Sequence, residues 1–217
     1  MLDCLFSVAL VPPPGKTRGG VMWEAMEFLR HLAGSKSICA AGVPLGACFG
    51  LVDYCQTGAD IQAAWHRSLP FWSRHREQGD ALRSLRNLLG RWQLNGRAFH
   101  CQAGAFTLAL ENQKLSIVQQ QTVLTVKALL GQMLVTSDDM GKYSEEQGFE
   151  LEEAVMLRES KIGTVKEIES DVWKIDFEQG NTPWSAWVNL TKSIKNRTLP
   201  NGSPVELRPY ETLILKA

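Results

Sequence analysis

Aspartates that follow short apolar runs are the residues of this sequence best suited to chemistry. Asp53 and Asp60 lie seven residues apart, in a segment punctuated by glycines at positions 46, 50 and 58. Residues 49–55 are mostly apolar and predict a short buried strand. Asp60 follows this strand, where the loop after a barrel strand carries working side chains. The same position also suits an N-cap or turn residue before residues 61–65, and spacing alone leaves both interpretations open.

Two other places in the chain hold candidate carboxylates. Asp3 lies among apolar residues at the start of the sequence. Because burying a lone carboxylate is costly, we expect Asp3 either at a strand end facing a cleft or exposed near a frayed terminus. Asp138 and Asp139 follow the apolar run 133–136. They could line a cleft at a strand end, or they could cap the segment that follows.

Composition argues against several other classes of function. Basic and acidic residues both number 23, so there is no charge excess that favours nucleic acid. The loop 65–79 interleaves Trp, His and Arg, but sugar stacking or plain packing explains it better than base stacking. No apolar run approaches the roughly 20 residues that span a bilayer. No Cys/His cluster has metal-ligand spacing, and we expect neither a metal nor a cofactor.

The cysteines favour a cytoplasmic protein. There are five, an odd number, scattered and mostly within apolar runs, which is typical of reduced core thiols. The N-terminal residues are apolar but lack the basic region of a signal peptide. Triplets that resemble glycosylation sites begin at Asn189, Asn196 and Asn201, but such short motifs arise easily by chance.

Periodicity divides the chain into two regions. Helical spacing predicts helices over 20–32, 78–94, 116–130 and 144–157, with short strands near 38–42, 49–55, 97–101 and 133–136 between them. Strands that alternate with helices indicate an α/β region with a parallel sheet. After residue 160, period-two alternation predicts antiparallel strands. We therefore expect domains at 1–159 and 160–217, the second resembling a small β-sandwich.

Three blocks of sequence, at 2–5, 42–60 and 129–139, resemble the melibiase-type α-galactosidases (glycoside hydrolase family 36). The middle block carries Pro-Leu-Gly at 44–46, Gly-Leu-Val-Asp at 50–53, then Asp60, with Trp65 beyond it. The resemblance implies an α/β fold, a partial (β/α)8 TIM barrel of about strands 4/5 to 8, followed by a small antiparallel β-domain.

The resemblance also implies a reaction. It assigns Asp3 as the nucleophile and Asp60 as the acid/base of a retaining glycoside hydrolase that cleaves terminal α-galactosides by double displacement. Retention requires the two carboxyl groups about 5–5.5 Å apart. Asp53, Gln56 and Trp65 would contact an α-galactoside or a related oligosaccharide.

The sequence departs from the family at three points. Met1 stands where the family has a lysine, Gln56 where it has an arginine, and residues 101–104 lack two carboxylates of a family loop. We therefore expect a fragment with weak or no activity alone, completed by a missing N-terminal half or by homo-oligomerisation. A non-catalytic carbohydrate-binding remnant is one alternative, and a scaffold that binds a protein through an exposed apolar edge is another.

Overall fold

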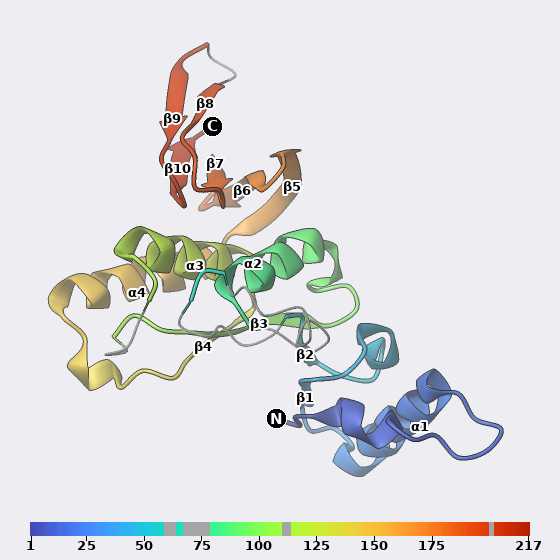
Figure 1. Cartoon of the computed structure of the whole chain (residues 1–217). Helices are drawn as coiled ribbons and strands as arrows, with labels where there is room; N and C mark the ends of the chain where they lie inside the picture. The colour runs from blue at the N-terminus through green and yellow to red at the C-terminus, as the bar shows by residue number, and fades with distance from the viewer. Residues whose placement is uncertain (59–63, 67–78, 110–113, 200–201) are drawn as a thin grey trace.

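The structure, a computed structural model, describes residues 1–58, 64–66, 79–109, 114–199 and 202–217. Its first part is a sheet whose strands follow chain order: β1 (Cys39–Ala40), β2 (Tyr54–Gln56), β3 (His100–Phe106) and β4 (Met133–Thr136). All neighbouring pairs are parallel. Leu2 extends the order on the β1 side through an isolated parallel bridge to Ala40. The predicted parallel α/β region is confirmed, with four parallel strands and the bridge at Leu2, five parallel stretches in all among the described residues. Strands β1–β4 and the helices beside them are labelled in Figure 1.

Four helices precede, separate and follow these strands, and each begins at a residue suited to capping. They are α1 (Arg18–Ala33), α2 (Ala81–Gly90), α3 (Ile117–Leu130) and α4 (Glu145–Arg158). Thr17 and Asp80 accept backbone N–H groups at the starts of α1 and α2. Ser116 and Ser144 form complete capping boxes with Gln119 and Gln147, which satisfy backbone donors that would otherwise lack partners. The four helices predicted from periodicity are therefore confirmed, with shifted ends.

The strand predicted at 49–55 is largely wrong. Residues 45–48 form a short 3-10 helix, η2 (Leu45–Cys48), and the chain then turns at Gly50, whose φ is +73°. The N–H groups of Leu51 and Val52 bond to the carbonyl of Cys48, so β2 begins only at Tyr54. An apolar run marks burial here and does not by itself distinguish a strand from a tight turn.

The second part of the chain is antiparallel. Its sheet has the order β10-β7-β6-β5 and contains β5 (Lys161–Glu169), β6 (Val172–Gln179), β7 (Thr182–Asn189) and β10 (Thr212–Lys216). A separate pair is formed by β8 (Lys195–Thr198) and β9 (Pro204–Leu207). Gly180 and Asn181, with φ of +54° and +66°, make the tight turn between β6 and β7.

Helices α2 and α3 lie between the parallel sheet and the antiparallel strands (Figure 1). Arg86 of α2 pairs with Asp171, and the Thr122 hydroxyl of α3 donates to the carbonyl of Tyr210. Buried apolar residues of both parts belong to one continuous core. Helix α4 ends at Arg158 and β5 begins at Lys161, next to the predicted boundary, and the division into two folding units stays a prediction.

Helix α1 buries only part of its apolar face. Met22 and Met26 are buried, whereas Phe28 and Leu32 are 61% and 65% exposed. Exposed apolar side chains also occur on the 3-10 helix η1 (Leu5–Ala9) and on α4, near the two lateral edges of the parallel sheet. No helix in the described part of the chain is long and apolar enough to cross a membrane.

Candidate functional site

The carboxyl ends of the parallel strands form the candidate site. Strand register aligns Ala40, Cys55 and Cys101 in one row and Gln56 with Gln102 in the next. All three residues of the first row are fully buried. Because side chains alternate along a strand, Gln56 points to the opposite face of the sheet from Cys55.

Asp3 also lies at the carboxyl end of the parallel strands. Leu2 bridges Ala40 in parallel, so Asp3, the next residue, is level with Ala41. Alternation then assigns Asp3 to the face that carries Gln56, with one strand between them, or about 10 Å between backbones at ordinary strand spacing. Asp3 is exposed, and its Oδ1 accepts the N–H of Cys4 at 2.6 Å.

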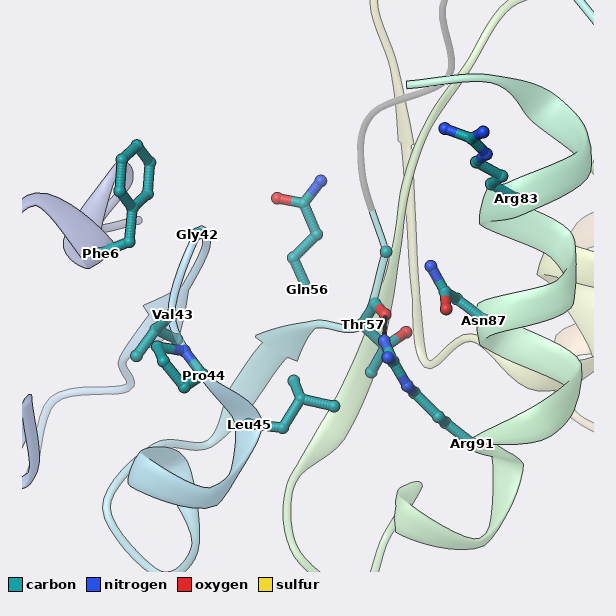
Figure 2. Close-up of a pocket in the computed structure, with 11 residues that line it drawn as sticks. Phe6, Gly42, Val43, Pro44, Leu45, Gln56, Thr57, Arg83, Asn87 and Arg91 are labelled. Atoms are coloured by element: carbon teal, nitrogen blue, oxygen red, sulfur yellow. Dashed lines mark hydrogen bonds between the residues drawn. The ribbon is translucent and has the colours of Figure 1, made fainter. Parts of the chain in front are cut away.

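A pocket of about 460 Å³ opens beside Gln56 (Figure 2). One wall is apolar and comes from η1 and the segment after β1. It contains Phe6, Gly42, Val43, Pro44 and Leu45. The floor is the end of β2, at residues 56–58. This volume lies within the range of small-molecule sites.

The opposite wall of the pocket is polar and comes from α2. Arg83, Asn87 and Arg91 are spaced four residues apart, so they line one face of the helix (Figure 2). Arg91 Nη1 donates to the carbonyl oxygen of Thr57 at 2.5 Å, which fixes the guanidinium against the end of β2. The Arg83 guanidinium lies 3.7 Å from Asp80, the fully buried N-cap of α2.

Two residues predicted to bind substrate lie away from the pocket. Asp53 precedes β2, at the amino end of the strand, where its Oδ2 accepts Arg30 Nη2 at 2.7 Å and the N–H of Ile38 at 2.8 Å. The bond from Arg30 lowers the pKa of Asp53. Trp65 is buried and packs edge-on against Tyr210, with ring centroids 4.9 Å apart. Of the four predicted site residues that the structure describes, only Gln56 lines the pocket, and Asp3 lies at the same end of the parallel strands.

Asp60 lies outside the described residues, so its predicted role stays a prediction. Asp138 and Asp139, which could have lined a cleft or capped a segment, make local bonds. Asp138 Oδ2 accepts the N–H groups of Leu108 and Ala109 and the Tyr143 hydroxyl. Asp139 caps the 3-10 helix η5 (Met140–Lys142). Asp138 therefore ties the ends of β3 and β4 together.

The buried side of the strands carries thiols. Cys48 and Cys55 have their sulfurs 3.7 Å apart, and burial raises the pKa of Cys101 to about 11. All five cysteines are free, as the sequence predicts. No group of three or more His, Cys, Asp or Glu side chains with metal-binding geometry occurs among the described residues.

Sequence reasoning missed the polar wall. For this segment the sequence predicts only a helix over 78–94. The spacing of four between Arg83, Asn87 and Arg91 is a usable signal, but only strand order shows that this face meets the end of β2. Lys127 was also missed. It is fully buried on α3 and donates to the carbonyls of Gly104 and Ala105 at 2.9 and 2.7 Å.

Solved structures share this arrangement of strands and helices. An α-galactosidase from Thermus thermophilus, in complex with p-nitrophenyl α-D-galactopyranoside, superposes on 83% of this chain with a TM-score of 0.64 and 21% identity. The chain is similar in fold to α-galactosidases. α-Galactosidase I from Mortierella vinacea matches 92% of the chain with a TM-score of 0.63 and 10% identity. A GH27 β-L-arabinopyranosidase from Geobacillus stearothermophilus matches 92% with a TM-score of 0.64 and 11% identity.

The chain spans only part of these enzymes. It covers 35% of the Thermus enzyme, 60% of the Mortierella enzyme and 54% of the Geobacillus enzyme. No protein-family model and no curated protein matches the sequence. At these identities the likeness shows a fold shared with part of these barrel enzymes and leaves the activity open.

Proposed function

We propose that the chain is the C-terminal part of a retaining glycoside hydrolase that acts on terminal α-galactosides. The observation that carries the proposal is that Asp3, which follows the bridge between Leu2 and Ala40, and Gln56, which lines the pocket, both lie at the carboxyl ends of parallel strands. Barrel enzymes hold their active sites at this edge of the sheet. The fold likeness to α-galactosidases supports the choice of substrate.

In this mechanism Asp3 attacks the anomeric carbon and forms a covalent glycosyl ester as the bond to the leaving oxygen breaks. Asp60 donates its proton to that oxygen. It then removes a proton from water, which attacks the anomeric carbon and releases Asp3. Asp60 needs a raised pKa for the first step, and Asp3 must be ionised. Gln56 lines the pocket at the end of β2.

We further propose that this chain does not supply the whole barrel. A complete barrel has eight parallel strands, against five parallel stretches in the described part of this chain. The exposed apolar side chains on η1, α1 and α4 flank the two open edges of the sheet. A complementary N-terminal half, or a second copy of this chain, would cover them, and the chain alone would turn over little substrate. Its free, mostly buried thiols suit the cytoplasm.

A carbohydrate-binding remnant without catalysis is the second candidate. Gln56 supplies an amide where the resemblance implies an arginine, and a neutral amide lacks that charge. Within β3 the Oε1 of the buried Gln102 accepts the N–H of Gly104, so this segment serves internal bonding instead of presenting carboxylates.

Titration of the chain with methyl α-galactoside, followed by NMR or calorimetry, tests the proposal. We expect saturable binding that is weakened by Gln56→Ala and unaffected by the exposed control Glu152→Gln. Methyl β-glucoside should bind more weakly. Absence of α-galactoside binding would overturn both candidates. Release of nitrophenol from the chromogenic galactoside, lost in Asp3→Asn and Asp60→Asn, would exclude the remnant and show that the chain alone suffices.

A further inference from the structure

A second pocket, of about 310 Å³, lies at the amino ends of β3 and β4. Its lining comes from the segment before β3, the end of α3, the residue before β4 and the start of β5. The described residues that adjoin the gaps at 59–63 and 110–113 follow the carboxyl ends of β2 and β3, and those that adjoin 67–78 lie at the start of α2. This pocket is therefore at the opposite end of the strands from Gln56, away from the ends of these gaps. Its volume is at the lower end of the range of small-molecule sites.

The apolar lining of this second pocket centres on Trp92, the first residue of the 3-10 helix η4 (Trp92–Leu94). Trp92 is half-buried, and the neighbouring lining residues Leu129 and Leu130 of α3 are buried. The turn that carries the indole is closed by a bond from the Asn95 N–H to the Trp92 carbonyl at 3.1 Å. A ring held in this way suits the apolar face of a sugar.

The rest of the lining is rich in hydrogen-bonding groups. The side chains of Gln93, Arg97 and Gln132 bond to none of the described residues. Asn95 Oδ1 accepts the N–H of Cys101 at 2.8 Å, which fixes the amide and leaves its N–H groups without a partner among the described residues. The glutamine amides supply acceptors as well as donors. Because a sugar hydroxyl both donates and accepts, this mixture suits a carbohydrate.

The charges around the second pocket favour a neutral ligand. Arg97 and Lys161 are exposed cations in its lining. Leu129 and Leu130 are the last residues of α3, and the final carbonyls of a helix carry partial negative charge and lack intrahelical donors. Glu178 lies opposite Lys161 in the pairing of β5 with β6. These charges offset one another, so an anion gains little here.

We propose that the second pocket binds one sugar unit of a neutral carbohydrate, with the ring against Trp92 and the hydroxyls bonded by Gln93 and Gln132. The site is separate from the pocket at Gln56. The inference goes beyond the proposed function, because it holds whether or not the chain hydrolyses a glycoside.

NMR of the full chain tests this site, with the indole N–H signal of Trp92 as the reporter and Trp92→Phe to assign it. Titration with methyl α-galactoside or methyl α-glucoside should shift that signal until it saturates. The indole signal of Trp23, an exposed tryptophan on α1, should not move. Gln132→Ala and Arg97→Ala should each weaken this binding about threefold to tenfold, the scale of one hydrogen bond. Arg18→Ala, at an exposed arginine of α1, is the matched control and should leave it unchanged.

The variant Gln56→Ala separates this inference from the proposed function. We expect it to leave the Trp92 shift unchanged, whatever it does to binding at the carboxyl ends of the strands. A Trp92 signal that moves with neither sugar would overturn the inference, even if Gln56→Ala still weakens galactoside binding. A shift that glycerol reproduces at the same concentration, or that Gln132→Ala and Arg97→Ala leave unchanged, would also overturn it. Displacement of the sugar by inorganic phosphate would overturn the neutral ligand.

Discussion

Arg30 Nη2 of α1 lies 2.7 Å from Asp53 Oδ2, which precedes β2. The same guanidinium donates through Nε to the carbonyl of Leu51, and Asp53 also accepts the N–H of Ile38. This set of bonds ties the first helix to the amino ends of β1 and β2. It gives Asp53 a structural role that neither its spacing from Asp60 nor the family resemblance indicated.

Asp53→Asn tests this role. We expect the free energy of unfolding to fall by about 0.5–1 kcal/mol at pH 7, the scale of a partly exposed ion pair. The folded protein has the lower pKa at Asp53, so its contribution is present above the unfolded pKa of about 3.9 and lost as the pH falls through the folded pKa. Urea unfolding at pH 7 and near pH 3 measures the difference between wild type and variant. If the difference in unfolding free energy between wild type and Asp53→Asn were as large near pH 3 as at pH 7, the ionic contribution would be contradicted. Glu152→Gln is the control.

Lys127 supports the end of β3 from within the core. Lys127→Met keeps most of the side-chain volume but leaves the carbonyls of Gly104 and Ala105 without these donors. We expect a loss of about 2 kcal/mol in stability, because buried acceptors without partners are costly. Lys166→Met, on the exposed face of β5, should change stability little. If Lys127→Met were as stable as the wild type or more stable, the prediction would be wrong. Burying the ammonium group would then cost more free energy than its two hydrogen bonds contribute.

Gly104 forms the irregularity in β3 that presents these carbonyls. Its φ is +77°, and the pairing of β3 with β4 shifts register between Gln102 and Ala105. Gly104→Ala should destabilise the chain by about 1–2 kcal/mol, since a Cβ is strained in this conformation. Gly148→Ala makes the matched control, because Gly148 lies within α4 with open space around its Cβ position and should gain about 0.5–1 kcal/mol. Thermal unfolding measures both variants. Melting temperatures that shift in the same direction would contradict the strain that we assign to a side chain at position 104.

The cysteines should differ sharply in reactivity. Cys4 is exposed, while Cys48, Cys55 and Cys101 are fully buried. Burial also raises the pKa of Cys101 to about 11, so little reactive thiolate forms there at neutral pH. We expect Cys4 to react first with a maleimide or an aromatic disulfide, and Cys4→Ser to remove this fast phase. Modification of Cys55 or Cys101 in the folded protein at the rate of Cys4 would contradict the burial of the β2–β3 row.

The sequence predicted the helices and the change from parallel to antiparallel strands because those features are local. Ser116 and Ser144 carry capping signals within four residues, and β4 follows directly from the run 133–136. The turn at Gly50 was missed because an apolar run has the same composition in a buried turn and in a strand. The site was harder still. Arg83 and Arg91 line the same pocket as Gln56 only because of the pairing of β2 and the packing of α2, which local patterns do not encode.

The central claim is that Asp3 and Asp60 flank the glycosidic bond of an α-galactoside at the carboxyl ends of the parallel strands. A crystal structure of the Asp60→Asn protein with an α-galactoside tests it most directly. The account predicts that the anomeric carbon lies between the two side chains, whose carboxyl and amide groups are about 5–5.5 Å apart. A separation beyond about 9.5 Å, or side chains on opposite faces of the sheet, would contradict it.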